Sequence, residues 1–337
     1  MKKLFLTSAI CHLTFYMLLA QPTSWSSRGV GGGGALFSPS INPANSSEYY
    51  IACDMSELFH TTDFGLTYSQ VHFSEFGGGH NSKVCYTSTA NLLYSISYIS
   101  DIGTPVTSTD NGVTWSLVAG NPDPSQDVYT IHVDYTASSR IIISTYGEIY
   151  FSSNGGTSFT QIHTALNGGS GNVVGGVFFD GQNIYIGTND GVLVSTNGGG
   201  TWNTTTVTGI TNGDQIWSFA GAKVGGATRF FCLTANAGNI YVGLQGSDYF
   251  GFYTSVYSCD YGSTQWVAKN TGITTNDYPM FVDMAENDIN TVYLAGSNSV
   301  SEPMIMKTTN AGGNWSQTFI TNNNQNIITL QKRRDFG

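Results

Sequence analysis

One short motif recurs six times along the chain and constrains its fold more than any other feature. Its pattern is Ser/Thr-x-Asp/Asn-x-Gly-x-Thr-aromatic, and the segment from Ser108 to Trp115 shows it most clearly. The fifth copy, around Asp260, is looser than the others. The Asp or Asn positions are Asp63, Asp110, Asn154, Asn197, Asp260 and Asn310. The steps between them are 47, 44, 43, 63 and 50 residues, and such a period indicates one four-stranded propeller blade per copy.

The chemistry of the motif predicts a tight turn between two strands. The Asp or Asn side chain can accept hydrogen bonds from N–H groups of its own turn, and the Gly supplies a positive φ. Strongly β-forming runs precede several copies, such as 141–143 and 149–151. The order is therefore strand, short turn, strand, motif, strand. The long fourth step, of 63 residues, predicts an insertion in the fifth blade, within 222–257.

These residues resemble the Asp-box (BNR) repeats of sialidases, sortilin-type ectodomains and xyloglucanase-type glycoside hydrolases. The resemblance implies an all-β fold: a β-propeller of six to seven four-stranded blades with Asp-box hairpins. In those families the box is a structural hairpin away from the substrate face. We therefore expect none of the six box residues to be catalytic.

The N-terminus predicts export. Lys2 and Lys3 precede a mostly apolar stretch that ends at Ala20, so residues 1–20 are expected to be a signal peptide. Residues 21–337 would form a single propeller, secreted or at the cell surface, without a membrane span once the signal is removed. Either the ring closes with six or seven blades, the last beginning in 321–337, or the chain is a fragment of a longer protein. Four cysteines remain after removal, and they permit disulfides or buried free thiols.

Charge and composition exclude several classes of function. The chain has 12 Lys and Arg against 22 Asp and Glu, a formal net charge of -10, which argues against nucleic-acid binding. There is no Gly-x-Ser-x-Gly elbow and no His-Glu-x-x-His. The few arginines argue against the Arg triad of a sialidase. We expect no cofactor and no metal.

A second resemblance concerns residues 31–54. A glycine run, a strand, an Asn-Pro turn at Asn42 and Pro43, and a strand ending at Asp54 are similar to the start of xyloglucanase-type propellers. The resemblance implies that Asp54 is a catalytic carboxylate, the candidate general base. The chain departs from the pattern in having Met55 where the family usually has glycine. The family's second carboxylate sits in a second propeller, for which this chain has no room.

Further candidates come from the expected starts of the inner strands, near the central mouth. There, acids and amides could bind sugar hydroxyls, and aromatic rings could stack on apolar sugar faces. The alternative is that these groups only cap strand starts and meet water. The candidate substrate residues are His80, Asp127, Asn172, Asp214, Trp217, Asp277 and Tyr278.

The sequence leaves three functions open. One is a secreted, xyloglucanase-like propeller that acts on or binds a β-glucan-like polysaccharide or surface glycan. The second is a non-catalytic extracellular module of a larger exported protein that binds glycan or protein. The third is a purely structural repeat module of a larger exported protein. Whether the chain is an enzyme stays open, because an inverting glycosidase needs both an acid and a base and only Asp54 is assigned.

Overall fold

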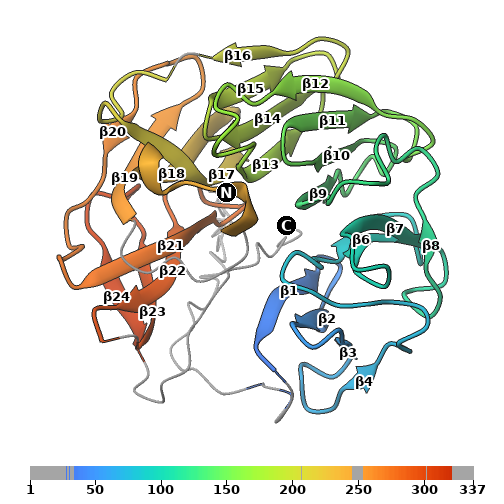
Figure 1. Ribbon diagram of the computed structural model, residues 1–337. Helices are drawn as coiled ribbons and strands as arrows, with labels where there is room; N and C mark the ends of the chain where they lie inside the picture. Colours follow the sequence, from blue (N-terminus) through green and yellow to red (C-terminus); the bar gives the residue numbers. More distant parts are fainter. Residues whose placement is uncertain are drawn as a thin grey trace, which may run out of the picture.

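The computed structural model describes residues 28, 30, 34–205, 207–244, 253–300 and 302–320. These residues form six four-stranded antiparallel sheets, and each sheet uses four consecutive strands. The sheets follow one another around a central axis as the blades of a propeller (Figure 1). The predicted all-β propeller is thus confirmed, with six blades in the described part of the chain. The expected signal peptide and the stretch 321–337 lie outside the described residues.

Each blade runs from an innermost strand outward. The first three blades are β1 (Leu36–Asn42), β2 (Asn45–Cys53), β3 (Leu58–Thr61) and β4 (Ser69–Gln70); β5 (Cys85–Tyr86), β6 (Leu93–Ser97), β7 (Thr104–Ser108) and β8 (Ser116–Leu117); and β9 (Thr130–Val133), β10 (Ile141–Ser144), β11 (Glu148–Ser152) and β12 (Thr160–Thr164). The last three are β13 (Val174–Asp180), β14 (Asn183–Thr188), β15 (Gly191–Ser195) and β16 (Asn203–Thr205); β17 (Asp214–Val224), β18 (Ala227–Asn236), β19 (Tyr253–Asp260) and β20 (Val267–Ala268); and β21 (Asp277–Met284), β22 (Val292–Asn298), β23 (Pro303–Thr308) and β24 (Ser316–Ile320).

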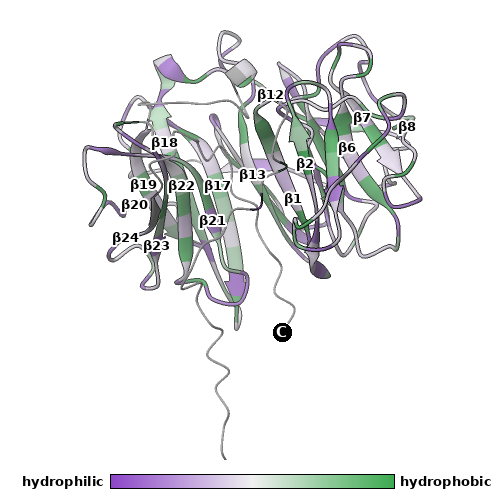
Figure 2. Ribbon diagram, turned by 90° about the horizontal axis from the view of Figure 1, so that it is seen from below, coloured by the Kyte–Doolittle hydropathy of each residue, from purple (hydrophilic) through white to green (hydrophobic). Residues whose placement is uncertain are grey.

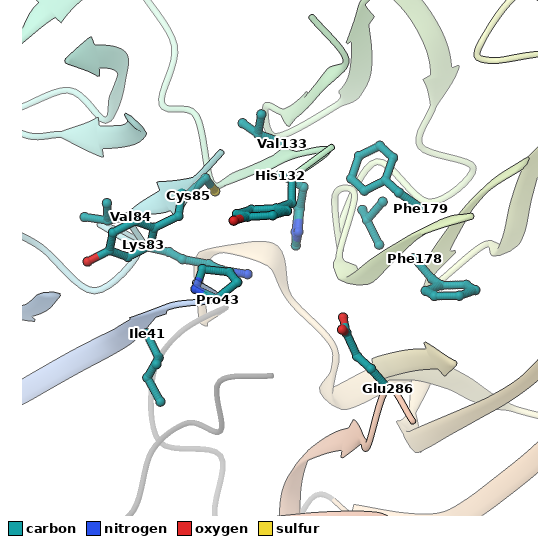
Figure 3. A pocket seen from close by; sticks show the side chains of 13 residues that line it. Ile41, Pro43, Lys83, Val84, Cys85, His132, Val133, Phe178, Phe179 and Glu286 are labelled. Carbon is teal, nitrogen blue, oxygen red and sulfur yellow. The ribbon is translucent and has the colours of Figure 1, made fainter. Parts of the chain in front are cut away.

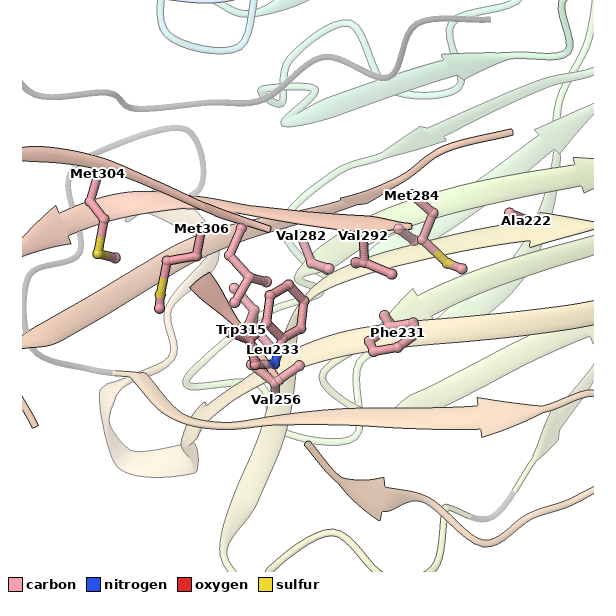
Figure 4. Packing of buried hydrophobic residues seen from close by; sticks show 12 residues of the cluster. Ala222, Phe231, Leu233, Val256, Val282, Met284, Val292, Met304, Met306 and Trp315 are labelled. Atoms are coloured by element: carbon pink, nitrogen blue, oxygen red, sulfur yellow. The ribbon is translucent and has the colours of Figure 1, made fainter. Parts of the chain in front are cut away.

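Apolar side chains of alternate strand positions fill the spaces between blades. In β10, Ile141 and Ile143 pack against the second blade, whereas Ile142 packs against the fourth. Because strand side chains alternate between the two faces of a sheet, a continuous apolar strand serves two interfaces at once. Figure 4 shows the equivalent layer between the fifth and sixth blades, where Phe231 lies among Val282, Met284 and other apolar residues. Hydrophobic residues concentrate on the strands (Figure 2).

The recurring motifs form closely similar turns after the third strand of their blades. Ser108 Oγ donates to Asp110 Oδ1 at 2.8 Å and accepts the N–H of Gly112 at 2.8 Å. Asp110 Oδ1 also accepts the N–H of Thr114 at 2.9 Å. The same three bonds recur at Asp63, Asn154, Asn197 and Asn310.

The fifth motif turn differs from the other five. Asp260 receives two bonds from the Arg229 guanidinium, at 2.6 and 3.1 Å, and Arg229 also donates to Asn290 Oδ1 of the sixth blade. The predicted insertion is present in this blade. β17 and β18 are the longest strands of the described chain, and two short 3₁₀ turns, η1 (Ala237–Asn239) and η2 (Val242–Leu244), follow β18.

Strand direction places two sets of residues at opposite ends of the propeller. Inner strands start at one end, here called the mouth end. Third strands finish at the other end, here called the turn end, where the motif turns lie. Asp54 follows β2, which runs antiparallel to β1 and returns to the mouth end. Asp63 follows β3, which runs back to the turn end. Asp54 and the motif residues are therefore separated by the height of a blade.

The cysteines at positions 53, 85, 232 and 259 are free thiols, and all four are buried. Burial raises the pKa of each thiol, so these cysteines behave as small apolar residues of the core. No helix among the described residues could cross a membrane, since none is both long and apolar enough.

Candidate functional site

Three aspartates line the candidate site at the mouth end, and two of them, Asp54 and Asp127, are residues that the sequence predicted. Asp54 leaves β2 with its N–H bound to Ala35 O at 3.2 Å, and its side chain is exposed. Asp127 lies three residues before β9 and is half-buried. One of its oxygens accepts the N–H of Gly103 at 2.7 Å. This bond fixes the direction of Asp127 while leaving its second oxygen for other partners.

A cavity of about 420 Å³ opens between these carboxylates at the mouth end. Its described lining comprises Asp54, Ser56, Gly78, Gly79, His80, Asn81, Tyr98, Asp101, Asp127, Tyr129 and Gly243. The volume falls within the roughly 300–1,000 Å³ typical of small-molecule sites. Three of the predicted site residues, at positions 54, 80 and 127, thus share one cavity.

His80 is held by the first blade as well as by its own loop. Its ring stacks on Phe37, with centroids 4.0 Å apart and planes 25° apart. Ser38 Oγ donates to the His80 carbonyl at 2.6 Å. The loop from blade 2 is therefore fastened to β1, and its imidazole has a fixed place at the edge of the cavity.

Tyr98 is a central side chain of this cavity that the sequence did not single out. Gly79 and Gly103 lie against opposite sides of its ring, and a Cβ at these positions would approach ring atoms to 2.6 and 3.1 Å. Asn81 Nδ2 donates to the Tyr98 hydroxyl at 3.3 Å. Burial raises the pKa of Tyr98 to about 12, and the nearby Asp127 and Tyr129 also raise it. The hydroxyl therefore stays protonated and can donate a hydrogen bond.

The insertion of the fifth blade supplies another wall. Val242 N–H donates to Ser170 O at 2.8 Å, and the Val242 side chain is fully buried. Tyr241 packs edge-on against Tyr146 of the third blade, at 6.1 Å. Gly243 reaches the cavity itself. The long fourth step of the repeat indicated this segment, but nothing local in the sequence indicated that it crosses to the third and fourth blades.

The other predicted residues lie outside the described lining of this cavity. Asn172, with no exposed surface, precedes β13, and its amide atoms have no hydrogen-bond partner in the described part of the chain. Trp217 is 7% exposed and packs with Val173 and Val242, so it belongs to the core. Asp214 begins β17.

Asp277 and Tyr278 begin β21 and also lie outside this lining. Asp277 Oδ2 accepts bonds from Thr274 N–H and Thr274 Oγ1, both at 2.8 Å. Asp277 therefore bonds within its own turn at the start of the strand, as a capping residue does. Within the described residues, no group of three or more His, Cys, Asp or Glu side chains could hold a metal ion.

Solved structures share this fold. An ancestral GH74 enzyme has a TM-score of 0.65 and 18% identity, over 90% of this chain and 39% of that one. A GH74 xyloglucanase from Xanthomonas campestris has a TM-score of 0.63 and 13% identity, over 88% of this chain and 47% of that one. The chain thus spans less than half the length of either enzyme.

A different size relation holds for YCF48. The structure of YCF48 bound to D1 peptide has a TM-score of 0.55 and 14% identity, over 86% of this chain and 83% of that one. YCF48 from Cyanidioschyzon merolae has a TM-score of 0.54 and 13% identity, over 87% and 88%. No protein-family model matches the sequence, and no curated protein matches it. At these identities the likenesses establish a shared propeller fold.

Proposed function

We propose that this chain is an exported propeller that binds a β-glucan-like polysaccharide in the mouth-end cavity and hydrolyses it. One observation carries the proposal: Asp54 and Asp127 line the same cavity as Tyr98 and Tyr129. Carboxylates and an amide suit sugar hydroxyls, and tyrosine rings suit the apolar faces of sugar rings. The likeness of the fold to GH74 enzymes agrees with this class of ligand.

The two carboxylates have complementary roles in the proposed reaction. Asp54 takes a proton from a water molecule whose oxygen attacks the anomeric carbon. Asp127 gives its proton to the glycosidic oxygen as the bond to the leaving sugar breaks. This division of labour is that of an acid and a base on opposite sides of a glycosidic bond. Asp127 thereby supplies, within one propeller, the second carboxylate that the sequence left unassigned.

Reducing-sugar release from soluble β-glucans, including xyloglucan, tests the proposal. We expect the wild-type chain to release sugar, and Asp54→Asn and Asp127→Asn each to lower the rate by about 100-fold or more. Asp214→Asn is the matched control, because Asp214 also stands at the start of an inner strand but outside the described lining of the cavity. Loss of activity in Asp214→Asn equal to that in Asp127→Asn would contradict the assignment of the acid.

A non-catalytic binding module is the second candidate. The observation that favours it is the likeness of the fold to YCF48, which one of the solved structures holds bound to D1 peptide. No sugar release, together with retardation of the wild-type chain in a xyloglucan affinity gel, would support a binding role at the same cavity. Retardation that survives Asp54→Asn and is lost with Tyr98→Ala would show that stacking carries the binding.

A further inference from the structure

A second cavity, of about 160 Å³, lies on the axis toward the turn end. Inner strands of five blades contribute to it or to the residues flanking it, from Ile41 in β1 to Glu286 after β21. Figure 3 shows Lys83 and His132 on one side of this hollow, Phe179 on another and Glu286 below, whereas the Phe178 ring turns away from it and packs on Tyr185 and Phe230. This cavity lies at the opposite end of the propeller from Asp54 and shares no described lining residue with the mouth-end cavity, so it is separate from the proposed glycan site.

Lys83 is a half-buried cation. Among the described residues its ammonium forms no hydrogen bond or ion pair, and neither does the His132 imidazole beside it. Burial, together with the Lys83 charge, holds the pKa of His132 well below its usual range, so the imidazole is neutral near pH 7 and has one N–H to donate. An anion that enters the cavity can form a charge-assisted hydrogen bond with this ammonium, and such a bond is stronger than one to a neutral ligand.

The remaining walls decide which anion fits. Val133, Val177, Phe178, Phe179 and Ile41 make much of the lining apolar, which suits a ligand with an apolar body. The one ammonium in the described lining, that of Lys83, balances one negative charge, and the apolar walls give a second charge no partner. Phosphate and sulfate are therefore disfavoured relative to a singly charged carboxylate.

We infer that this turn-end cavity binds a small organic monocarboxylate, with Lys83 and the His132 N–H holding the carboxylate and Val133 and Phe179 contacting the apolar body. Benzoate is the probe, and benzamide is its uncharged counterpart. Lys223 supplies the matched control, because it lies at the same end but outside the described lining, paired with Asp180 at 2.9 Å.

Calorimetric titration near pH 7 and at constant ionic strength measures the effect. We expect benzoate to bind the wild-type chain, Lys83→Met to weaken binding by about 10-fold or more, and Lys223→Met to change it less than about twofold. Benzamide should bind about 10-fold more weakly than benzoate. Equal affinities for benzoate in wild type and Lys83→Met, or no binding up to about 20 mM, would overturn the inference.

A second measurement uses the wild-type chain alone and does not depend on the folding of a variant. Benzoate should shift the His132 ring-proton resonances in an NMR titration, whereas the resonances of His60, half-buried beside Glu48, should stay in place. Binding of benzoate that leaves His132 unaffected would locate the ligand elsewhere and would contradict the inference. Failure of glycan binding would leave this result unchanged, since the two cavities are at opposite ends.

Discussion

Glu48 is a carboxylate that the fold buries at the turn end, where it joins the first two blades. It accepts bonds from His60 Nε2 at 3.0 Å and Asn42 Nδ2 at 2.7 Å within its own blade. It also accepts a bond from Asn111 Nδ2 of the second blade at 3.1 Å. The hydrogen bond from His60 is the largest influence that lowers the pKa of Glu48 to about 2.

This lowered pKa predicts a pH-dependent contribution to stability. A carboxyl group with a depressed pKa in the folded state stabilises the fold above its ordinary pKa of 4.5, and that contribution is lost as the pH falls from 4.5 toward about 2. We expect Glu48→Gln to lower the free energy of unfolding by about 2–3 kcal/mol near pH 7. In urea titrations the difference between the two proteins should shrink steadily below pH 4.5. A difference independent of pH would mean that Glu48 acts through shape and packing instead of charge.

At the scale of elements, the motif turn depends on one buried hydroxyl. Ser108 is 1% exposed and links the Asp110 carboxylate to the N–H of Gly112. Ser108→Ala would leave that N–H buried without its partner, so we expect a loss of about 1–2 kcal/mol in the free energy of unfolding. Thr109→Ala changes the adjacent exposed residue of the same turn and should cost less than about 0.5 kcal/mol. Equal losses in chemical denaturation would show that the hydroxyl does not carry the turn.

The same elements explain how far sequence alone could predict this molecule. The motif is local: hydroxyl, carboxylate or amide, and glycine all lie within five positions, so its spacing gave the blades and their order. Asp54 and Asp127 could be placed near the mouth because each adjoins a strand end. Their sharing of one cavity depends on how blades 1, 2 and 3 are rotated about the axis, and no short pattern encodes that rotation.

Other parts of the site left almost no local signal. Tyr98 lies against Gly79 and Gly103. Gly79 is distant from Tyr98 in the sequence, and neither glycine belongs to the repeat. The sequence places Trp217 near the start of a strand, where an aromatic ring could face the mouth. In the structure the insertion that carries Val242 packs against Trp217 and buries it. Both outcomes follow from contacts between blades, which the alternation of residues within a strand cannot specify.

At the scale of the whole molecule, ion pairs at the turn end join successive blades in two different environments. Arg140 is 9% exposed, pairs with the buried Asp134 of its own blade, and donates to the Gly181 carbonyl of the fourth blade. Arg229 pairs with Asp260, whose side chain is 61% exposed, and reaches the sixth blade through Asn290. Both arginines therefore span a blade boundary, but they differ in their access to water.

This contrast predicts that the same substitution has unequal effects on the ring. Arg140→Met leaves the Asp134 carboxylate buried without its cation, and we expect a loss of about 3 kcal/mol in the free energy of unfolding. Arg229→Met exposes Asp260 to water and should cost about 1 kcal/mol or less. The double variant Arg140→Met with Asp134→Asn should recover part of the first loss, because it removes the unpaired charge. Denaturation monitored by tryptophan fluorescence measures all three. If Arg229→Met lowered the free energy of unfolding as much as Arg140→Met, burial of the charges would not explain the effect. The contacts that both arginines make across a blade boundary would explain it instead.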